Sequence, residues 1–157
     1  MKYTGEYLVT FAEVPDEVTL CINISNCPYR CPGCHSPWLQ EDYGQTLTPE
    51  ILQDLVDKND GITCVCFMGG SEDDVLDLVR TMPANVKKAW YTGQDYLPDS
   101  FTLAYLDYVK IGPYKRDLGP LTSKTTNQRL YQIFHYSPDM DHIQNSIKDI
   151  TSRFWKD

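Results

Sequence analysis

The sequence predicts an α/β domain in which the strands of a parallel sheet are connected by crossover helices. Two observations lead to this fold class. Short strand-like stretches alternate with amphipathic helix-like stretches along most of the chain, and several of the strand-like stretches end at glycine. The chain of 157 residues contains no low-complexity segment or linker, and it is long enough to bury one core without disulfides. We therefore expect a single domain over residues 1–157.

The N-terminal third is expected to contain two strands and a helix. Residues 6–13 and 18–25 are the strands, on either side of Pro15-Asp16. In the second strand apolar and polar residues alternate, a period of two that is typical of a strand with one buried face; the apolar set is Val18, Leu20, Ile22 and Ile24. Thr48-Pro49 is typical of a helix start, because threonine caps a helix and proline is favourable at its first position. The apolar stripe of that helix consists of Ile51, Leu52, Leu55 and Val56.

The middle of the chain repeats this pattern of strand followed by helix. A strand over 63–68 is expected to end at Gly69-Gly70, and a helix with Val75, Leu76, Val79 and Met82 on its apolar side follows it. The next expected strand, over 87–92, is closed by Gly93. A short helix over 101–106 and a strand over 108–111, ended by Gly112-Pro113, complete the series. Such an alternation favours a parallel sheet, because parallel neighbours need a crossover connection.

The C-terminal part is expected to form a loop, a strand and a helix. Residues 112–127 are rich in glycine, proline, serine and threonine, and residues 128–135 are expected to be the last strand. Ser137-Pro138 has the pattern of a helix start, and the apolar stripe of the expected helix consists of Ile143, Ile147, Ile150 and Phe154.

Four loops that follow expected strands carry unusual residues. They are the cysteine-rich stretch after 18–25, Gly69-Gly70, Thr92-Gly93 and Gly112-Pro113. In parallel sheets the carboxyl ends of the strands lie at one edge, and ligands bind there. We therefore expect these four loops to meet around one site.

The composition excludes several classes of partner. The formal net charge is −8, which argues against binding a nucleic-acid backbone or an anionic membrane surface. No apolar run reaches the roughly 20 residues of a membrane span, and residues 1–6 lack the apolar core of a signal peptide. We therefore expect a cytoplasmic protein whose cysteines are thiols or metal thiolates.

The stretch from Cys27 to His35 contains three cysteines, Cys27, Cys31 and Cys34, within eight residues. Three thiolates can bind three irons of a cubane cluster and leave the fourth iron open to a small molecule. They can also form a zinc site that a distant His135 or His142 completes, since His35 lies too close to Cys34 to share one tetrahedral ion with it. Both alternatives place a metal in this loop.

The other three cysteines lie in expected strands. Cys64 and Cys66 point to the same side of their strand, and Cys21 lies on the polar face of its own. A second cluster is conceivable, but free cysteine usually behaves as a small buried hydrophobic residue. We expect packing residues here.

The chain resembles the radical S-adenosylmethionine enzymes, whose signature is Cys-x3-Cys-x2-Cys in the loop after a strand. Within that superfamily it looks like the activating proteins of anaerobic ribonucleoside-triphosphate reductases. The resemblance spans nearly the whole chain and rests on Cys31-Pro32-Gly33-Cys34-His35, Met68-Gly69-Gly70, Tyr108-Val109-Lys110-Ile111-Gly112-Pro113-Tyr114 and Thr125-Thr126-Asn127-Gln128-Arg129-Leu130-Tyr131. It implies a single-domain open (partial) α/β barrel of parallel strands.

The resemblance also implies a chemistry. Cys27, Cys31 and Cys34 would bind three irons of a [4Fe–4S] cluster, and the amino and carboxylate groups of S-adenosylmethionine would chelate the fourth. One electron from a reduced flavodoxin-like donor would cleave the sulfonium into methionine and a 5′-deoxyadenosyl radical. That radical would take a hydrogen atom from a backbone glycine of the large reductase subunit. Activation of a different glycyl-radical enzyme, or a non-catalytic zinc-binding interaction module, is the alternative.

The resemblance implies further cofactor contacts, which are Gly33, Cys34, His35, Gly69, Gly70, Glu72 and Lys110. Gly69-Gly70 would offer bare backbone to the methionyl amine, and Lys110 would pair with the methionine carboxylate. Gly33 and His35 would lie against the adenine. In relatives an acidic residue follows the double glycine directly, whereas here Ser71 precedes Glu72.

Overall fold

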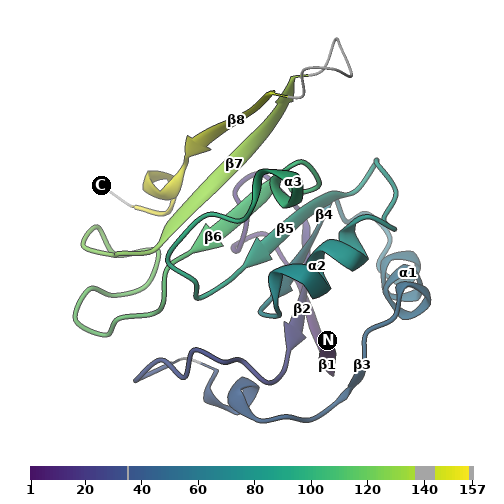
Figure 1. The fold of residues 1–157 in the computed structure, drawn as a ribbon, viewed down its shortest axis with the longest axis horizontal. Helices are drawn as coiled ribbons and strands as arrows, with labels where there is room; N and C mark the ends of the chain where they lie inside the picture. Colours follow the sequence, from purple (N-terminus) through teal and green to yellow (C-terminus); the bar gives the residue numbers. More distant parts are fainter. Residues whose placement is uncertain (35, 137–143, 156–157) are drawn as a thin grey trace.

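The computed structural model describes residues 1–34, 36–136 and 144–155. Its framework is one sheet of eight described strands in the order β3-β1-β2-β4-β5-β6-β7-β8 (Figure 1). The strands are β1 (Lys2–Thr10), β2 (Thr19–Ile24), β3 (Gln45–Thr46), β4 (Cys64–Met68), β5 (Lys87–Tyr91), β6 (Tyr108–Ile111), β7 (Arg129–Tyr136) and β8 (Gln144–Asp149). The helices are α1 (Pro49–Lys58), α2 (Glu72–Val79) and α3 (Ser100–Leu103), with short 3₁₀ helices η1 (Pro37–Gln40) and η2 (Thr151–Phe154).

The predicted fold class, an open α/β barrel of parallel strands with crossover helices, is wrong. The sheet is mixed, and four of the seven pairs of described neighbouring strands are antiparallel. Only the pairs β2–β4, β4–β5 and β5–β6 are parallel. At both sides of these four strands the chain turns back on itself instead of crossing over. The β1–β2 connection, residues 11–18, is too short for a crossover, whereas the longer connection 112–128 between β6 and β7 forms a loop instead of a crossover helix.

The C-terminal helix expected from the isoleucine spacing is also wrong. Residues 144–149 form β8, which pairs antiparallel with β7 and places Ile147 opposite Ile133. Without β8, β7 would be the edge of the sheet with unpaired main-chain N–H and C=O groups, and β8 provides their hydrogen-bond partners. Thr151–Phe154 is a single 3₁₀ turn. The expected helix start at Ser137-Pro138, and Ile143, lie outside the described residues.

Both longer helices begin where local capping predicts. The hydroxyl of Thr48 accepts a hydrogen bond from the Ile51 amide at 3.2 Å, and Pro49 occupies the first turn of α1. The hydroxyl of Ser71 likewise accepts from the Asp74 amide at 3.2 Å, so α2 begins at Glu72.

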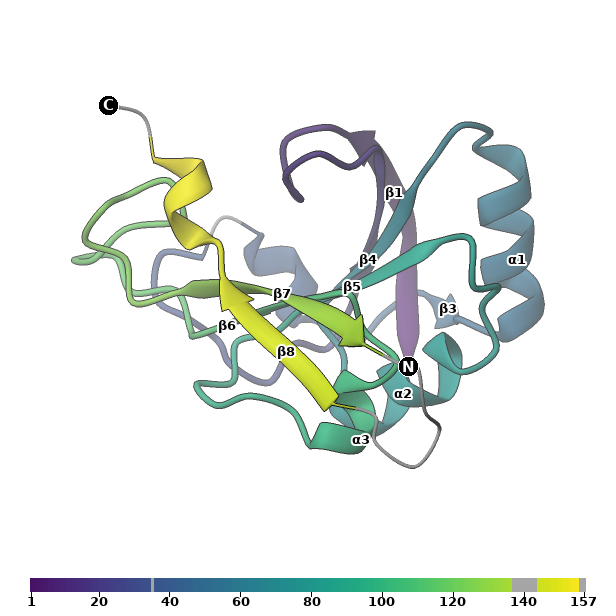
Figure 2. The same ribbon diagram turned by 90° about the horizontal axis from the view of Figure 1, so that it is seen from above.

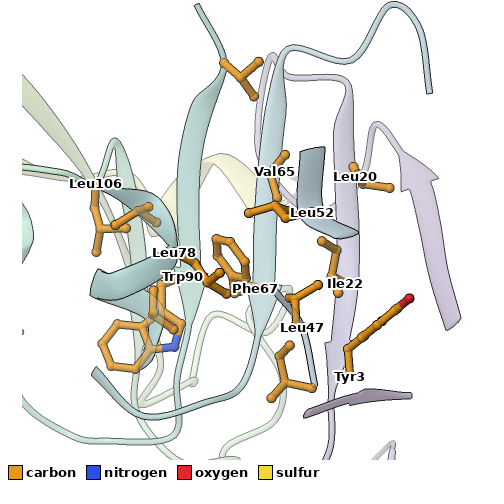
Figure 3. Close-up of a cluster of buried hydrophobic side chains, with 14 of the residues drawn as sticks. Tyr3, Leu20, Ile22, Leu47, Leu52, Val65, Phe67, Leu78, Trp90 and Leu106 are labelled. Carbon is orange, nitrogen blue, oxygen red and sulfur yellow. The ribbon is translucent and has the colours of Figure 1, made fainter. Parts of the chain in front are cut away.

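The helices cover one face of the sheet, and loops cover the other (Figure 2). On the helix face the core contains Ile22, Phe67 and Trp90, each fully buried, together with the apolar sides of the helices (Figure 3). On the opposite face Val14 and Ile150 pack over a second cluster that contains Cys21, Cys64, Cys66, Ala89, Tyr91, Tyr108 and Leu130. The three strand cysteines are 5%, 0% and 0% exposed, so their prediction as packing residues is confirmed. Within the described part of the chain, no helix combines the length and apolar character that crossing a membrane requires.

A buried carboxylate ties strands together at the end of the sheet opposite the cysteine loop. Glu17 accepts hydrogen bonds from the ammonium of Lys87 at 2.7 Å, the hydroxyl of Tyr108 at 3.0 Å and the hydroxyl of Thr63 at 2.5 Å. Burial raises the pKa of Glu17, but these donors outweigh it and hold the pKa below its usual value. The network joins the β1–β2 turn to β5 and β6.

Candidate functional site

The cysteine loop begins directly after β2 and is closed at its base by the main chain. The amide of Asn26 donates to the carbonyl of Glu41, and the amide of Cys27 donates to the carbonyl of Leu39, both at 2.9 Å. Asn26 has a φ of 60°, which turns the chain out of the strand. These bonds fix the two ends of the loop relative to the sheet.

The second half of the loop is a tight turn at Gly33. The amide of Cys34 donates to the carbonyl of Cys31 at 3.1 Å, and Gly33 has a φ of 74°. A Cβ on Gly33 would lie 2.7 Å from the guanidinium of Arg116, so glycine lets the turn approach the loop that follows β6. The amide of Ser36 points to the sulfur of Cys34 at 3.4 Å. Main-chain contacts therefore orient Cys34.

The loop cysteines line one cavity of about 580 Å³, which we call the thiol pocket. Its wall also contains residues from the ends of three neighbouring strands, namely Gly69 and Gly70 after β4, Thr92 and Gly93 after β5, and Lys110 and Gly112 at β6. The expectation that these strand-end loops meet around one site is confirmed. It holds although the fold class is wrong, because β2, β4, β5 and β6 are parallel.

Gly93 forms part of this wall because it has no side chain. A Cβ at this position would lie 2.7 Å from the ring of Tyr29. Tyr29 in turn lines both the thiol pocket and a neighbouring cavity of about 570 Å³. The close contact between Gly93 and Tyr29 thus sets the partition between the two cavities.

Lys110 places a cation in the thiol pocket. Its ammonium donates a hydrogen bond to the carbonyl of Gly112 at 3.3 Å. Burial lowers the pKa of Lys110 to about 8, while the nearby thiols of Cys31, Cys27 and Cys34 act in the opposite direction. The side-chain amide of Gln128 donates to the same carbonyl at 3.3 Å and also lines the pocket. The ammonium is therefore held at the wall with a main-chain carbonyl as its acceptor.

Glu13 is a residue of this pocket that sequence reasoning missed. It lies in the turn between β1 and β2, and its side chain lines the thiol pocket. Burial raises the pKa of its carboxyl group, and Lys110 opposes this rise. Nothing in the local sequence indicates that this turn reaches the strand ends. The neighbouring Val14, an apolar residue of the same turn, is fully buried.

Two predicted contacts, Glu72 and Gly33, stand apart from the thiol pocket. Glu72 lines the neighbouring cavity, and its carboxylate accepts a hydrogen bond from the Asp99 amide at 2.9 Å. Gly33 packs against Arg116 rather than lining the thiol pocket. His35 lies outside the described residues.

The three loop cysteines line one pocket without converging on a single point. Among the described residues, no group of three His, Cys, Asp or Glu side chains converges closely enough to hold one metal ion. In a cubane cluster each thiolate binds an iron of its own, so three cysteines spread over one pocket wall suit that group. His135 does not complete a zinc site, because it does not line the thiol pocket and its ring bonds to the Leu106 carbonyl at 2.8 Å. His142 lies outside the described residues.

The chain matches no protein-family model, no curated protein and no solved structure. The resemblance to radical S-adenosylmethionine enzymes therefore rests on the sequence motifs, above all the spacing of Cys27, Cys31 and Cys34. The geometry adds that these cysteines share a pocket with the glycine turns and with Lys110.

Proposed function

We propose that this protein is a radical S-adenosylmethionine activase that generates a glycyl radical on the large subunit of an anaerobic ribonucleoside-triphosphate reductase. One observation carries the proposal. The three cysteines of the Cys-x3-Cys-x2-Cys motif line the same pocket as Lys110 and the glycine turns after β4 and β5. Among the described residues of that pocket there is no fourth cysteine and no histidine, which leaves a coordination position for a small molecule.

The residues of the pocket have distinct roles in this proposal. Cys27, Cys31 and Cys34 hold three irons of a [4Fe–4S] cluster. When bound, the cluster supplies one electron to the sulfonium of S-adenosylmethionine, which breaks into methionine and the radical that removes a hydrogen atom from the partner's glycine. Lys110 donates hydrogen bonds to the ligand carboxylate, because its ammonium has only a weakly held main-chain carbonyl as acceptor. Gly69 and Gly70 line the pocket and are proposed to present their main chain to the methionyl amine, while the space left by their missing side chains holds Ile24 and Met1.

The cell supplies the remaining parts of this reaction. A flavodoxin-like protein delivers the electron, and a reducing cytoplasm keeps the cysteines available as thiolates. The acidic chain, at −8, suits a protein partner rather than a nucleic acid or a membrane.

Anaerobic reconstitution with iron and sulfide tests the cofactor. We expect a brown protein with about four irons per chain. With dithionite and S-adenosylmethionine it should release 5′-deoxyadenosine. Cys31→Ala should lose both properties, whereas Cys66→Ala, a change in the buried strand cluster, should keep both. A colourless protein that binds one zinc ion refutes the proposal.

Electron paramagnetic resonance tests the partner. Mixing the reconstituted protein with an anaerobic ribonucleotide reductase, S-adenosylmethionine and reductant should produce a glycyl radical signal on the reductase. A silent reductase, together with a signal on another glycyl-radical enzyme, would assign the activase to that second enzyme.

A further inference from the structure

Glu13 reaches the thiol pocket because the turn between β1 and β2 folds over the sheet. This turn, residues 11–18, lies on the side of the sheet away from α2 and α3 (Figure 2). The hydroxyl of Tyr91 donates a hydrogen bond to the Glu13 carbonyl, and the next residue, Val14, is fully buried. The main chain at Glu13 is thus fixed on both sides, and its side chain enters the pocket from a defined position.

Glu13 and Lys110 carry the formal charges of this pocket. Among the described residues that line the thiol pocket, they are the only Asp, Glu, Lys or Arg residues. Lys110 acts electrostatically on Glu13, yet the described structure contains no ion pair between the two. A partly buried carboxylate is costly unless a positive charge or a donor compensates it. Both residues line the pocket, so a ligand bound there would meet one acidic and one basic residue.

We propose that Glu13 is a specificity-determining residue that compensates the positive sulfonium charge of S-adenosylmethionine. This inference rests on the proposed function. A sulfonium has no N–H or O–H group to donate, so a protein recognises it through its positive charge, and Glu13 is the one carboxylate among the described residues that line the pocket. With Lys110 on the ligand carboxylate, Glu13 supplies the complementary charge for the cation of the same ligand. The thioether of methionine, the product of cleavage, is uncharged, so Glu13 favours the substrate over the product.

Ligand discrimination tests this role. S-adenosylhomocysteine differs from S-adenosylmethionine by one methyl group and the sulfonium charge. Calorimetric titration of the reconstituted protein, held without reductant so that no turnover occurs, measures affinity for both. We expect Glu13→Gln to weaken S-adenosylmethionine binding about tenfold and to leave S-adenosylhomocysteine binding within about twofold of wild type.

Two further variants and a melting measurement make the result specific to the charge. Glu13→Asp keeps the carboxylate and should retain most of the preference for the sulfonium ligand. Glu6→Gln removes the same charge from exposed β1, outside the pocket, and should leave both affinities unchanged. Thermal melting of Glu13→Gln should occur at or above the wild-type temperature, because burial raises the pKa of this carboxyl group and the neutral amide avoids the cost of burying a charge.

The outcomes separate this inference from the proposed function. Equal loss of both ligands in Glu13→Gln, or no loss of either, overturns the role of Glu13 and leaves the activase proposal standing. Failure of the wild-type protein to bind either adenosyl ligand overturns both.

Discussion

Replacement of Lys110 by methionine separates the stability of the fold from the function of the thiol pocket. Burial lowers the pKa of Lys110 to about 8, from an ordinary value of 10.5. The folded protein therefore holds this proton less tightly than the unfolded chain does. Methionine has a similar length and no charge. We expect Lys110→Met to unfold less readily than wild type at pH 7 and to bind S-adenosylmethionine more weakly.

The size of the stabilisation follows from the two pKa values. The interval between 10.5 and about 8 corresponds to about 3 kcal/mol, at 1.36 kcal/mol for each pH unit. Solvent reaches part of the Lys110 side chain, and the substitution removes its hydrogen bond to the Gly112 carbonyl, worth about 1 kcal/mol. The expected net gain at pH 7 is therefore about 1–2 kcal/mol.

The pH dependence has a defined sign. Between pH 8 and pH 10.5 the unfolded chain binds more protons at Lys110 than the folded protein does. The free energy of unfolding of wild type should therefore rise over this interval relative to Lys110→Met. Above pH 10.5 the lysine is neutral in both states, so the advantage of Lys110→Met should disappear.

Urea denaturation followed by tryptophan fluorescence, at pH 7 and pH 10, measures these differences. Lys88→Met is the matched control for binding. Lys88 is also buried with a lowered pKa, but its ammonium donates to the Pro83 carbonyl at 2.8 Å and lies outside the thiol pocket. It should leave ligand affinity unchanged. The reasoning is refuted if Lys110→Met is less stable than wild type at pH 7 and the difference in unfolding free energy between the two proteins is the same at pH 10.

Three other predictions concern one position in the thiol pocket and two outside it. Gly93→Ala places a Cβ 2.7 Å from the ring of Tyr29 and should lower the stability measured in thermal melts by about 1–3 kcal/mol. Adding Tyr29→Ala to the same chain should recover part of that loss. If the stability losses of the two substitutions simply add, the contact is contradicted. Glu17→Gln should cost about 1–3 kcal/mol at pH 7. Because the pKa of Glu17 is lowered in the folded protein, the stability of wild type should fall toward that of Glu17→Gln as the pH drops below about 4.5. Acid titration followed by circular dichroism checks this. Cys64→Ser should destabilise by about 1–3 kcal/mol relative to wild type, because a hydroxyl costs more to bury than a thiol at this fully buried position, without changing the iron content of reconstituted protein.

The central strands could be predicted from the sequence, and the edges of the sheet could not. The alternation in 18–25 and the apolar run 63–68 specify strands with defined buried faces, and the helix after the second is capped by local sequence. Pairing direction at the edges depends on non-local contacts. Ile147 fits a helical stripe equally well until β7 supplies Ile133 as a cross-strand neighbour.

The site was predictable where it depends on strand order alone. Cys31 and Lys110 meet because the loop after β2 and the end of β6 lie at one edge of four parallel strands. Glu72 lies in the neighbouring cavity because Ser71 caps α2, which makes Glu72 its first residue and directs the carboxylate to the Asp99 amide. Glu13 could not be predicted, because its place depends on the path of a turn across the sheet face.

Burial divides the six cysteines into two chemical classes. Cys64 and Cys66 lie under Val14 in the second core cluster, and burial raises the pKa of both thiols well above the ordinary range. The thiolate is the form that binds metal, so these cysteines remain protonated and inert at neutral pH. Cys27, Cys31 and Cys34 are partly exposed and line the thiol pocket, so reagents and iron can reach their sulfur atoms. Iron loading should therefore select the loop cysteines, and the strand cysteines should react with thiol reagents only after the sheet unfolds.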